Sequence, residues 1–162
     1  MQDHGRAALA RLLAELPEAV LETHAHRGDA TATVAHERIV EVLTLLRDGE
    51  GLDFEMLVDL TAVDHLGREP RFEVVYHLYS VRQNHRVRIK VGVSEEACEV
   101  DSVVDVYPSA NWMEREAFDL YGVGFRNHPD LRRLLLYDEF DGHPLRKDYA
   151  KEKRQPLIGP RN

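Results

Sequence analysis

Apolar residues recur at helical spacing in two stretches of the first third of the chain. The first stretch covers residues 7–16 and is closed by Pro17, which predicts a short helix. The second lies in ERIVEVLTLLRDGEG, where the apolar residues share one side and Gly49 ends the pattern. Between them, VLETHAHRGDATATVAH alternates around Gly28 and Asp29, which suit a turn. This alternation predicts a hairpin of two short strands.

The middle of the chain has the composition of a β-sheet. The segments MLVDLTAVDH, RFEVVYHLYSV and HRVRIKVGVS are rich in Val, Tyr, Phe and Thr, and short polar connections separate them. Connections of this length predict an antiparallel meander. In the third segment Arg86, Arg88 and Lys90 alternate with apolar residues, so we expect one face of that strand to be solvated or to lie against an acidic partner.

The regular pattern ends soon after this sheet. VDSVVDVYPSANWMEREAFDLYG predicts a short helix broken at Pro108 and then a longer helix capped at Gly122. From Asn127 onward Pro, Gly, Asp and Arg are frequent, and such segments are typically disordered or lie across another surface. We therefore predict an α+β fold with a mainly antiparallel sheet flanked by helices. It comprises a domain over residues 1–126 and an extended, irregular C-terminal arm over residues 127–162 that contacts a partner.

Composition and charge exclude several function classes. The chain has 162 residues, of which 43% are hydrophobic and 31% charged, as in an ordinary globular protein. Its net charge of -8 argues against a general affinity for nucleic acid, because phosphate binding needs a surplus of Lys and Arg. Cys98 is the only cysteine, which excludes an internal disulfide and a cysteine-based zinc site. No apolar run approaches the length that spans a bilayer, so we expect membrane contact only through a partner.

The longer of the last two helices carries the densest candidate chemistry. Glu114, Arg115, Glu116 and Asp119 lie close together, and paired carboxylates can perform general acid–base catalysis. Helical geometry places Arg115, Glu116 and Asp119 on one polar face, with Arg115 and Asp119 spaced as an (i, i+4) pair. A solvated, salt-bridged face accounts for these three residues if the protein works alone.

Glu114 differs from its neighbours because it projects toward the apolar side of the helix. A carboxylate in that position needs a partner, since burying it unpaired is costly. Asn111 could be the N-cap of a capping box that includes Glu114. Arg132 or Arg133 could instead form an ion pair with it. The sequence favours neither solution over the other.

Templates for metal binding and nucleophilic catalysis find little support. The chain has nine histidines but no HExxH motif, and it has no GxGxxG, Walker A or GxSxG motif. His128 and His143 each precede proline, so we expect their side chains to fix turns by hydrogen bonding. Cys98 lies in the acidic segment SEEACEV, which disfavours a thiolate. No catalytic constellation stands out.

The arm mixes basic and apolar side chains: Arg126, Arg132, Arg133, Arg146 and Lys147 are interleaved with Leu131, Leu134, Leu135 and Leu145. Apolar residues in an irregular segment need a surface that buries them, and arginine is favoured where an interface must bind a carboxylate. We therefore expect the arm to contact another subunit. The alternative is an arm that folds back on its own domain.

The block from Glu114 onward resembles a known signature. EREAFDLYGVGFRNHPDLRRLLL closely resembles that of the thirty-kilodalton subunit of respiratory complex I, which is the C subunit of bacterial NADH-quinone oxidoreductase, and DGHPLRKDY resembles its continuation. The predicted order of helices and strands is compatible with this resemblance over the whole chain. The positions that carry it, and that we expect at partner interfaces, are Glu114, Arg115, Glu116, Asp119, Tyr121, Gly122, Phe125, His128, Pro129, Asp130, Leu131, Arg132, Arg133, Gly142, His143, Pro144, Leu145, Arg146, Lys147 and Asp148.

The resemblance implies a role in a proton-translocating enzyme rather than independent catalysis. In that enzyme electrons pass from NADH through flavin and iron–sulfur clusters in other subunits to quinone. The thirty-kilodalton subunit of the family holds no cofactor and packs against the quinone-site subunit and the iron–sulfur subunits. It lies at the periphery of the inner membrane, on the cytoplasmic side. We expect it to bind neither nucleic acid nor a small-molecule substrate, and to contribute no catalytic residue.

Two alternatives remain open on the sequence. The chain could be the equivalent subunit of a related membrane-bound hydrogenase or of an oxidoreductase that uses another electron donor. It could also be a stand-alone hydrolase that uses His and Asp side chains of the arm. Under the resemblance, we expect Glu114, Arg115, Glu116 and Asp119 to anchor the junction of helix and arm, partly through Arg132 and Arg133.

Overall fold

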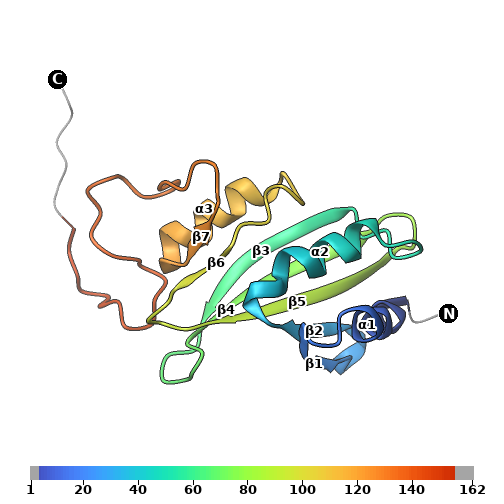
Figure 1. Cartoon of the computed structure of the whole chain (residues 1–162). Coiled ribbons are helices and arrows are strands. Elements are labelled where there is room, and N and C mark those ends of the chain that lie inside the picture. Colours follow the sequence, from blue (N-terminus) through green and yellow to red (C-terminus); the bar gives the residue numbers. More distant parts are fainter. Residues whose placement is uncertain (1–3, 156–162) are drawn as a thin grey trace.

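A five-stranded sheet and a smaller two-stranded sheet organise the chain. The structure is a computed structural model and describes residues 4–155. In chain order its elements are α1 (His4–Glu15), β1 (Val20–His24), η1 (His26–Gly28), β2 (Thr31–Val34), η2 (His36–Arg38), α2 (Ile39–Asp48), β3 (Met56–Asp64), β4 (Phe72–Ser80), β5 (His85–Val93), β6 (Glu99–Asp101), α3 (Ala110–Tyr121) and β7 (Gly124–Arg126), as Figure 1 shows.

The main sheet is mixed, with the strand order β1-β2-β5-β4-β3. β3, β4 and β5 form the predicted antiparallel meander, and β1 and β2 form the predicted hairpin. β2 and β5 are parallel, with Ala32 beside Ile89. The sequence did not predict this pairing, because α2 and two further strands separate the two partners along the chain. The predicted α+β class with a mainly antiparallel sheet is confirmed.

The alternation along β5 separates a buried face from a polar one. Val87, Ile89 and Val91 are buried, whereas Arg86 is exposed and Lys90 is half-buried. The buried side chains face α1 and α2, which lie on one side of the sheet (Figure 1). This arrangement confirms that the basic side chains share the uncovered face.

The first two helices agree with their sequence patterns. α1 ends at Glu15, two residues before Pro17. α2 buries Ile39, Val42, Leu43 and Leu46, and the following glycine at 49 donates its N–H to the carbonyl of Leu45 at 2.8 Å. Among residues 4–155, no helix is both long and apolar enough to cross a membrane.

The predicted short helix before Pro108 is wrong. β6 pairs in parallel with β7, and only a single turn follows it, in which Tyr107 donates its N–H to the carbonyl of Val103 at 2.8 Å. Val103 and Val106 are buried, so their helix-like spacing reflects two contacts with the core from a loop. The prediction of α3 is confirmed, and Gly122 ends it with a left-handed φ of 75°.

The described part of the arm, residues 127–155, folds back along α3 and past the end of the main sheet (Figure 1). The alternative of an arm that packs on its own domain therefore holds for these residues. The division at residue 126 stays a prediction. The rest of the basic tail, residues 156–162, lies outside the described residues.

Candidate partner-contact site at the junction of α3 and the arm

Helix α3 carries two carboxylates in the interior, Glu114 and Asp119, and both are 0% exposed. An ionised carboxylate in such a place requires hydrogen-bond donors and a nearby positive charge to offset the loss of water. The two residues meet this requirement to different degrees. Asp119 accepts four hydrogen bonds, one of them from a guanidinium, whereas Glu114 accepts two from neutral groups.

Asp119 is saturated with donors from the arm. Its Oδ1 accepts a hydrogen bond from Nη1 of Arg133 at 2.8 Å. Its Oδ2 accepts the backbone N–H groups of Leu134, Leu135 and Leu136 at 3.0, 2.7 and 2.9 Å. Burial acts to raise the pKa of Asp119, but these four donors outweigh it and hold the pKa below its ordinary value. Asp119 therefore remains ionised and fixes the course of the arm.

Arg115 fixes the preceding residues of the arm. Its Nε and Nη2 donate to the carbonyl oxygens of Arg132 and Arg133, both at 3.1 Å. Its guanidinium also lies over the ring of Trp112, 5.0 Å from the ring centre. Arg115 is thus buried against the arm, so the predicted solvated face is wrong for Arg115 and Asp119. Of the three residues, Glu116 alone is exposed.

Glu114 is buried, as predicted, but neither predicted partner binds it. Its Oε2 accepts the hydroxyl hydrogen of Ser102 at 2.7 Å, and its Oε1 accepts the backbone N–H of Val103 at 2.7 Å. Nε2 of His128 lies 3.9 Å from Oε2. The helix begins after Ser109, so Asn111 is not the N-cap. Burial raises the pKa of Glu114 to about 7, against the two hydrogen bonds, which lower it.

His128 fixes a turn of the arm, as expected, whereas the side chain of His143 contacts helix α3 instead. Nδ1 of His128 accepts the N–H of Asp130 at 3.0 Å, and its Nε2 lies 3.1 Å from the carbonyl oxygen of Asn111. Nδ1 of His143 lies 2.9 Å from the carbonyl oxygen of Asp119. Burial lowers the pKa of His143, which favours the neutral ring.

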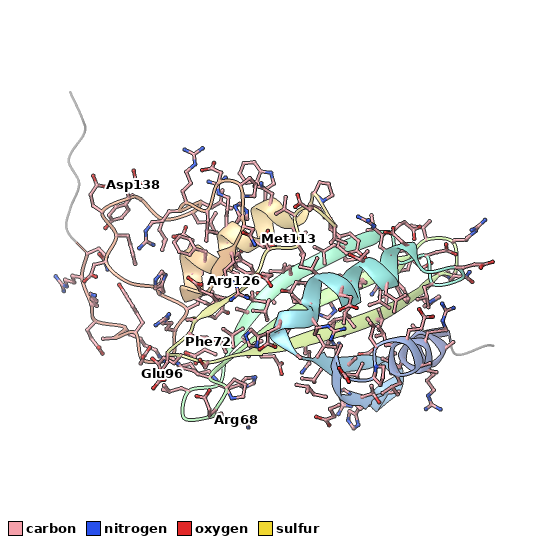
Figure 2. The ribbon with its side chains drawn as sticks, in the orientation of Figure 1. Arg68, Phe72, Glu96, Met113, Arg126 and Asp138 are labelled. Carbon is pink, nitrogen blue, oxygen red and sulfur yellow. The ribbon has the colours of Figure 1, made fainter. Side chains whose placement is uncertain are left out.

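The second half of the arm rests on the C-terminal end of α3. Nε of Arg146 donates to the carbonyl of Tyr121 at 2.5 Å. A Cβ at Gly122 would lie 2.6 Å from Cδ2 of His143, so only glycine allows both the left-handed turn and this close approach. The guanidinium of Arg146 also lies over Phe72, 5.0 Å from the ring centre, where the sheet meets the arm (Figure 2).

A buried arginine that sequence reasoning missed completes the attachment. Arg71 donates two hydrogen bonds to the carboxylate of Asp64, at 3.0 and 2.9 Å, and pairs with Glu95 at 2.5 Å and Asp148 at 2.9 Å. Lys147 donates its backbone N–H to Asp64 at 2.8 Å. These bonds raise the pKa of Arg71 above its ordinary value, led by the bonds to Asp64 and Asp148. No sequence motif links Arg71 with Asp148, so the contact between them was not predictable. The resemblance around residues 142–149 indicated only that Asp148 lies in a contact segment.

The predicted site residues therefore fall into two groups. The buried or half-buried group holds the arm to the domain: Glu114, Arg115, Asp119, Tyr121, Gly122, Phe125, His128, Leu131, Arg133, Gly142, His143, Pro144 and Arg146. The exposed group is Glu116, Pro129, Asp130, Arg132, Leu145, Lys147 and Asp148, of which Asp148 and the backbone of Lys147 also hold the arm. Sequence reasoning missed Tyr137 as an outward-facing aromatic, although it directly follows the signature.

The described residues offer no obvious place for a metal ion. Within residues 4–155, no three His, Cys, Asp or Glu side chains gather closely enough to bind one. Cys98 is half-buried, and burial raises the pKa of its thiol. The chemistry that this junction supports is the rigid presentation of apolar and charged side chains. Trp112, at 61% exposed, and Leu135, at 62%, are the most prominent of them.

Comparisons with known proteins bear on this junction. Residues 32–155 match the model of a family described as respiratory-chain NADH dehydrogenase, 30 Kd subunit. The chain is 47% identical to the C subunit of NADH-quinone oxidoreductase from Geobacter sulfurreducens over 161 residues, which cover 99% of this chain and 94% of the relative. It is 51% identical to the same subunit from Roseiflexus castenholzii over 140 residues, covering 86% and 80% of the two chains.

Two solved structures share the fold. A trypsin-resistant fragment of Nqo5 is 31% identical with a TM-score of 0.65, covering 76% of this chain and 99% of the fragment. A chain of a membrane-bound sulfane sulfur reductase, an archaeal respiratory membrane complex, has a TM-score of 0.75 and covers 91% of this chain and 86% of its own length. Its identity is 24%, so this second match shows a likeness of fold alone.

Proposed function

The chain belongs to the family of the 30-kilodalton subunit of respiratory-chain NADH dehydrogenase, and from this premise we propose that it is a cofactor-free assembly subunit of an NADH-quinone oxidoreductase. It joins the quinone-site subunit to the iron–sulfur subunits of the hydrophilic arm of that enzyme. It lies at the periphery of the inner membrane on the cytoplasmic side and reaches the membrane only through its partners. The signature residues act in assembly rather than in catalysis.

The observation that carries this proposal is the way α3 holds the arm. Ionic groups that an active site would turn toward a substrate, Arg115, Asp119 and Arg133, instead bind the backbone and side chains of the arm. They hold an irregular segment in one shape, which reduces the entropy lost when a partner binds. Exposed aromatic and arginine side chains on such a rigid support are typical of interface hot spots.

The absence of a cofactor in this subunit is supported by its chemistry. An iron–sulfur cluster requires several cysteine thiolates, and the sequence contains one cysteine, Cys98. Electron transfer would therefore take place in the partner subunits that carry flavin, clusters and quinone. The hydrolase alternative is weakened at His128, because both of its ring nitrogens face backbone groups.

The alternative that the chain belongs to a related complex is supported by the likeness of fold but not by the sequence identity. The sulfane sulfur reductase chain shows that this fold occurs in another respiratory complex, but at 24% identity it does not carry a function. The relatives at 46–48% identity that cover 99% of this chain are each named as the C subunit of NADH-quinone oxidoreductase. We therefore retain NADH as the donor of the whole enzyme in the proposal.

The proposal predicts that Leu135 lies in a subunit interface. Replacing it with glutamate introduces a charge on a side chain that is 62% exposed, so the isolated chain should fold normally. In the assembled enzyme that charge would be buried, and we expect the recovery of the other subunits to fall about tenfold, equivalent to ~1.4 kcal/mol or more. The measurement is co-purification of the subunits from membranes, together with NADH-quinone oxidoreductase activity.

The matched control is Leu21→Glu, because Leu21 is 68% exposed on β1, away from α3 and the arm. Leu21→Glu should assemble like the unchanged chain. Circular dichroism shows whether both variants are folded. If they are, and Leu135→Glu also assembles normally, the proposal that the C-terminal arm contacts a partner subunit through Leu135 is wrong.

A further inference from the structure

The two buried carboxylates of α3 differ in the charge that surrounds them. Asp119 receives a guanidinium and three backbone N–H groups. Glu114 receives one hydroxyl and one backbone N–H. Within the part of the chain that the structure describes, the only basic group within ion-pairing distance of Glu114 is the ring of His128, at 3.9 Å. Two neutral donors do not offset the loss of hydration of a fully buried charge.

His128 cannot neutralise Glu114 in the observed arrangement. Its Nδ1 accepts the N–H of Asp130, so the ring hydrogen lies on Nε2. That hydrogen is closer to the carbonyl of Asn111, at 3.1 Å, than to Glu114. A second ring proton would have to enter at Nδ1, where it would displace the N–H of Asp130. A charged pair would therefore require the turn at residues 128–130 to open.

Among residues 4–155, the other groups around Glu114 supply no positive charge that would stabilise its ionised form. From β4, the hydroxyl of Tyr76 is buried and has no hydrogen-bond partner among the described residues, and its pKa is raised by burial and by the charges of Glu114 and Asp101. From β6, Asp101 pairs with Arg126 at 2.9 Å, so that arginine is already engaged. Ser102 contributes only a neutral hydroxyl. No element packed against Glu114 supplies a free positive charge among residues 4–155.

We propose that Glu114 is a proton-binding site at the root of the arm: it carries a proton while the turn at residues 128–130 is closed and loses it when that turn opens. In the closed state the site is a neutral carboxylic acid, and Val103 donates to its carbonyl oxygen. On opening, the O–H bond of the acid breaks and the proton passes to solvent. The carboxylate then attracts the Nε2 hydrogen of His128 away from Asn111.

This site links proton uptake to the position of the arm. One residue, Leu131, separates residues 128–130 from Arg132 and Arg133, whose carbonyl groups are held by Arg115. Movement of the turn therefore shifts the start of the segment that faces a partner. The raised pKa of Glu114, about 7, places the transition close to neutral pH. The proposed assembly role requires no titrating group, so the inference goes beyond it and can fail independently.

The direct test is carbon-13 NMR of the glutamate side-chain carboxyls in the full, purified chain, titrated from acid to mildly alkaline pH. We expect the Glu114 carboxyl to titrate with a midpoint near 7. Trp112 is the only tryptophan, and it adjoins Asn111 and lies against Arg115, so its fluorescence reports on the same turn. We expect the fluorescence to change with the same midpoint.

Two substitutions separate this site from other titrating groups. Glu114→Gln keeps a carbonyl acceptor for Val103 and is neutral at every pH, so the Trp112 fluorescence change should disappear. Glu116→Gln alters an exposed carboxyl two residues away and should leave the change intact. A Glu114 carboxyl that stays ionised down to acid pH would overturn the proposal, and this measurement does not depend on whether the variant folds. A fluorescence transition that persists in Glu114→Gln would overturn it as well.

Discussion

At the scale of single residues, Arg132 and Arg133 are neighbours in the chain with different surroundings. The side chain of Arg132 is 73% exposed and pairs with nearby Asp130. The side chain of Arg133 is 19% exposed, pairs with Asp119, and donates to the carbonyl oxygens of Phe140 and Gly142 at 3.0 and 3.3 Å. One arginine is available to a partner, and the other connects distant parts of the same chain.

This difference predicts opposite effects of the two alanine substitutions. Arg133→Ala leaves Asp119 buried without its cation and should lower the free energy of unfolding of the isolated chain by about 3 kcal/mol. Arg132→Ala should change it by less than about 0.5 kcal/mol, as is usual for an exposed side chain. Instead, Arg132→Ala should weaken assembly with the partner subunits.

Urea unfolding of each purified variant measures the first effect, and co-purification from membranes measures the second. Equal losses of stability in the two variants would contradict the division of roles. The double variant is less informative than either single one, because it would lose stability and assembly together.

At the scale of elements, the second half of the arm is attached to the sheet through Arg71. This residue lies just before β4, beside Asp64 at the end of β3, and it reaches Asp148 in the arm. The attachment therefore joins a hairpin loop to a segment more than 70 residues away in the chain. Asp64 is 2% exposed, so it depends on Arg71 for its charge balance.

We predict that Arg71→Gln releases residues 143–150 from the sheet. Trypsin should then cut after Arg146 and Lys147 several times faster than in the unchanged chain, because the released backbone can enter a protease. Mass spectrometry of timed digests gives the cleavage sites. Arg88→Gln is the control, since Arg88 pairs with the exposed Asp29 on the outer face of the sheet. Unchanged cleavage in Arg71→Gln would show that Arg146 and His143 hold the arm without Arg71.

Sequence patterns predicted those elements whose partners are local. The periodicity of α2 and the alternation of β5 indicate their buried faces, and these predictions are confirmed. The segment before Pro108 has the spacing of a helix but forms a turn, because buried valines can have the same spacing in a loop. The parallel pairing of β2 with β5 depends on long-range packing, which no local pattern encodes.

The candidate site was predictable in position but not in its contacts. The burial of Glu114 follows from its place on the helix, and this prediction is confirmed. Its partners Ser102 and Val103 lie in an irregular segment without a motif, so the sequence pointed only to a capping box with Asn111 or to an arginine of the arm. The solvated face was wrong because the arm covers it, and the sequence does not show the path of an irregular segment.

At the scale of the whole molecule, the buried carboxylates make opposite contributions to stability as the pH changes. The pKa values of Asp119 and Asp64 are lowered in the folded state, so their contributions are present above the unfolded pKa and are lost as the pH falls. The pKa of Glu114 is raised from 4.5 to about 7, so its contribution is present below the unfolded pKa and is lost as the pH rises through about 7.

The difference in stability between Glu114→Gln and the unchanged chain isolates this last contribution. Between about pH 4.5 and pH 7 the unchanged chain should lose roughly 3 kcal/mol relative to the variant. Denaturant unfolding of both proteins at several pH values measures this difference. A difference that is constant with pH would mean that Glu114 has the same pKa in the folded and unfolded states.

The residues of the domain that bind the arm all precede the arm in the chain. Asp64, Arg71, Asp119 and Gly122 belong to the domain, and the contact between Asp64 and Lys147 spans 83 residues. A ribosome releases a chain from its N-terminal side, so the domain can fold before residues 143–148 are synthesised. A chain broken off earlier would still fold its sheet but would leave Arg71 without Asp148. The surface that faces a partner thus forms last, and only a chain translated past the arm can present it.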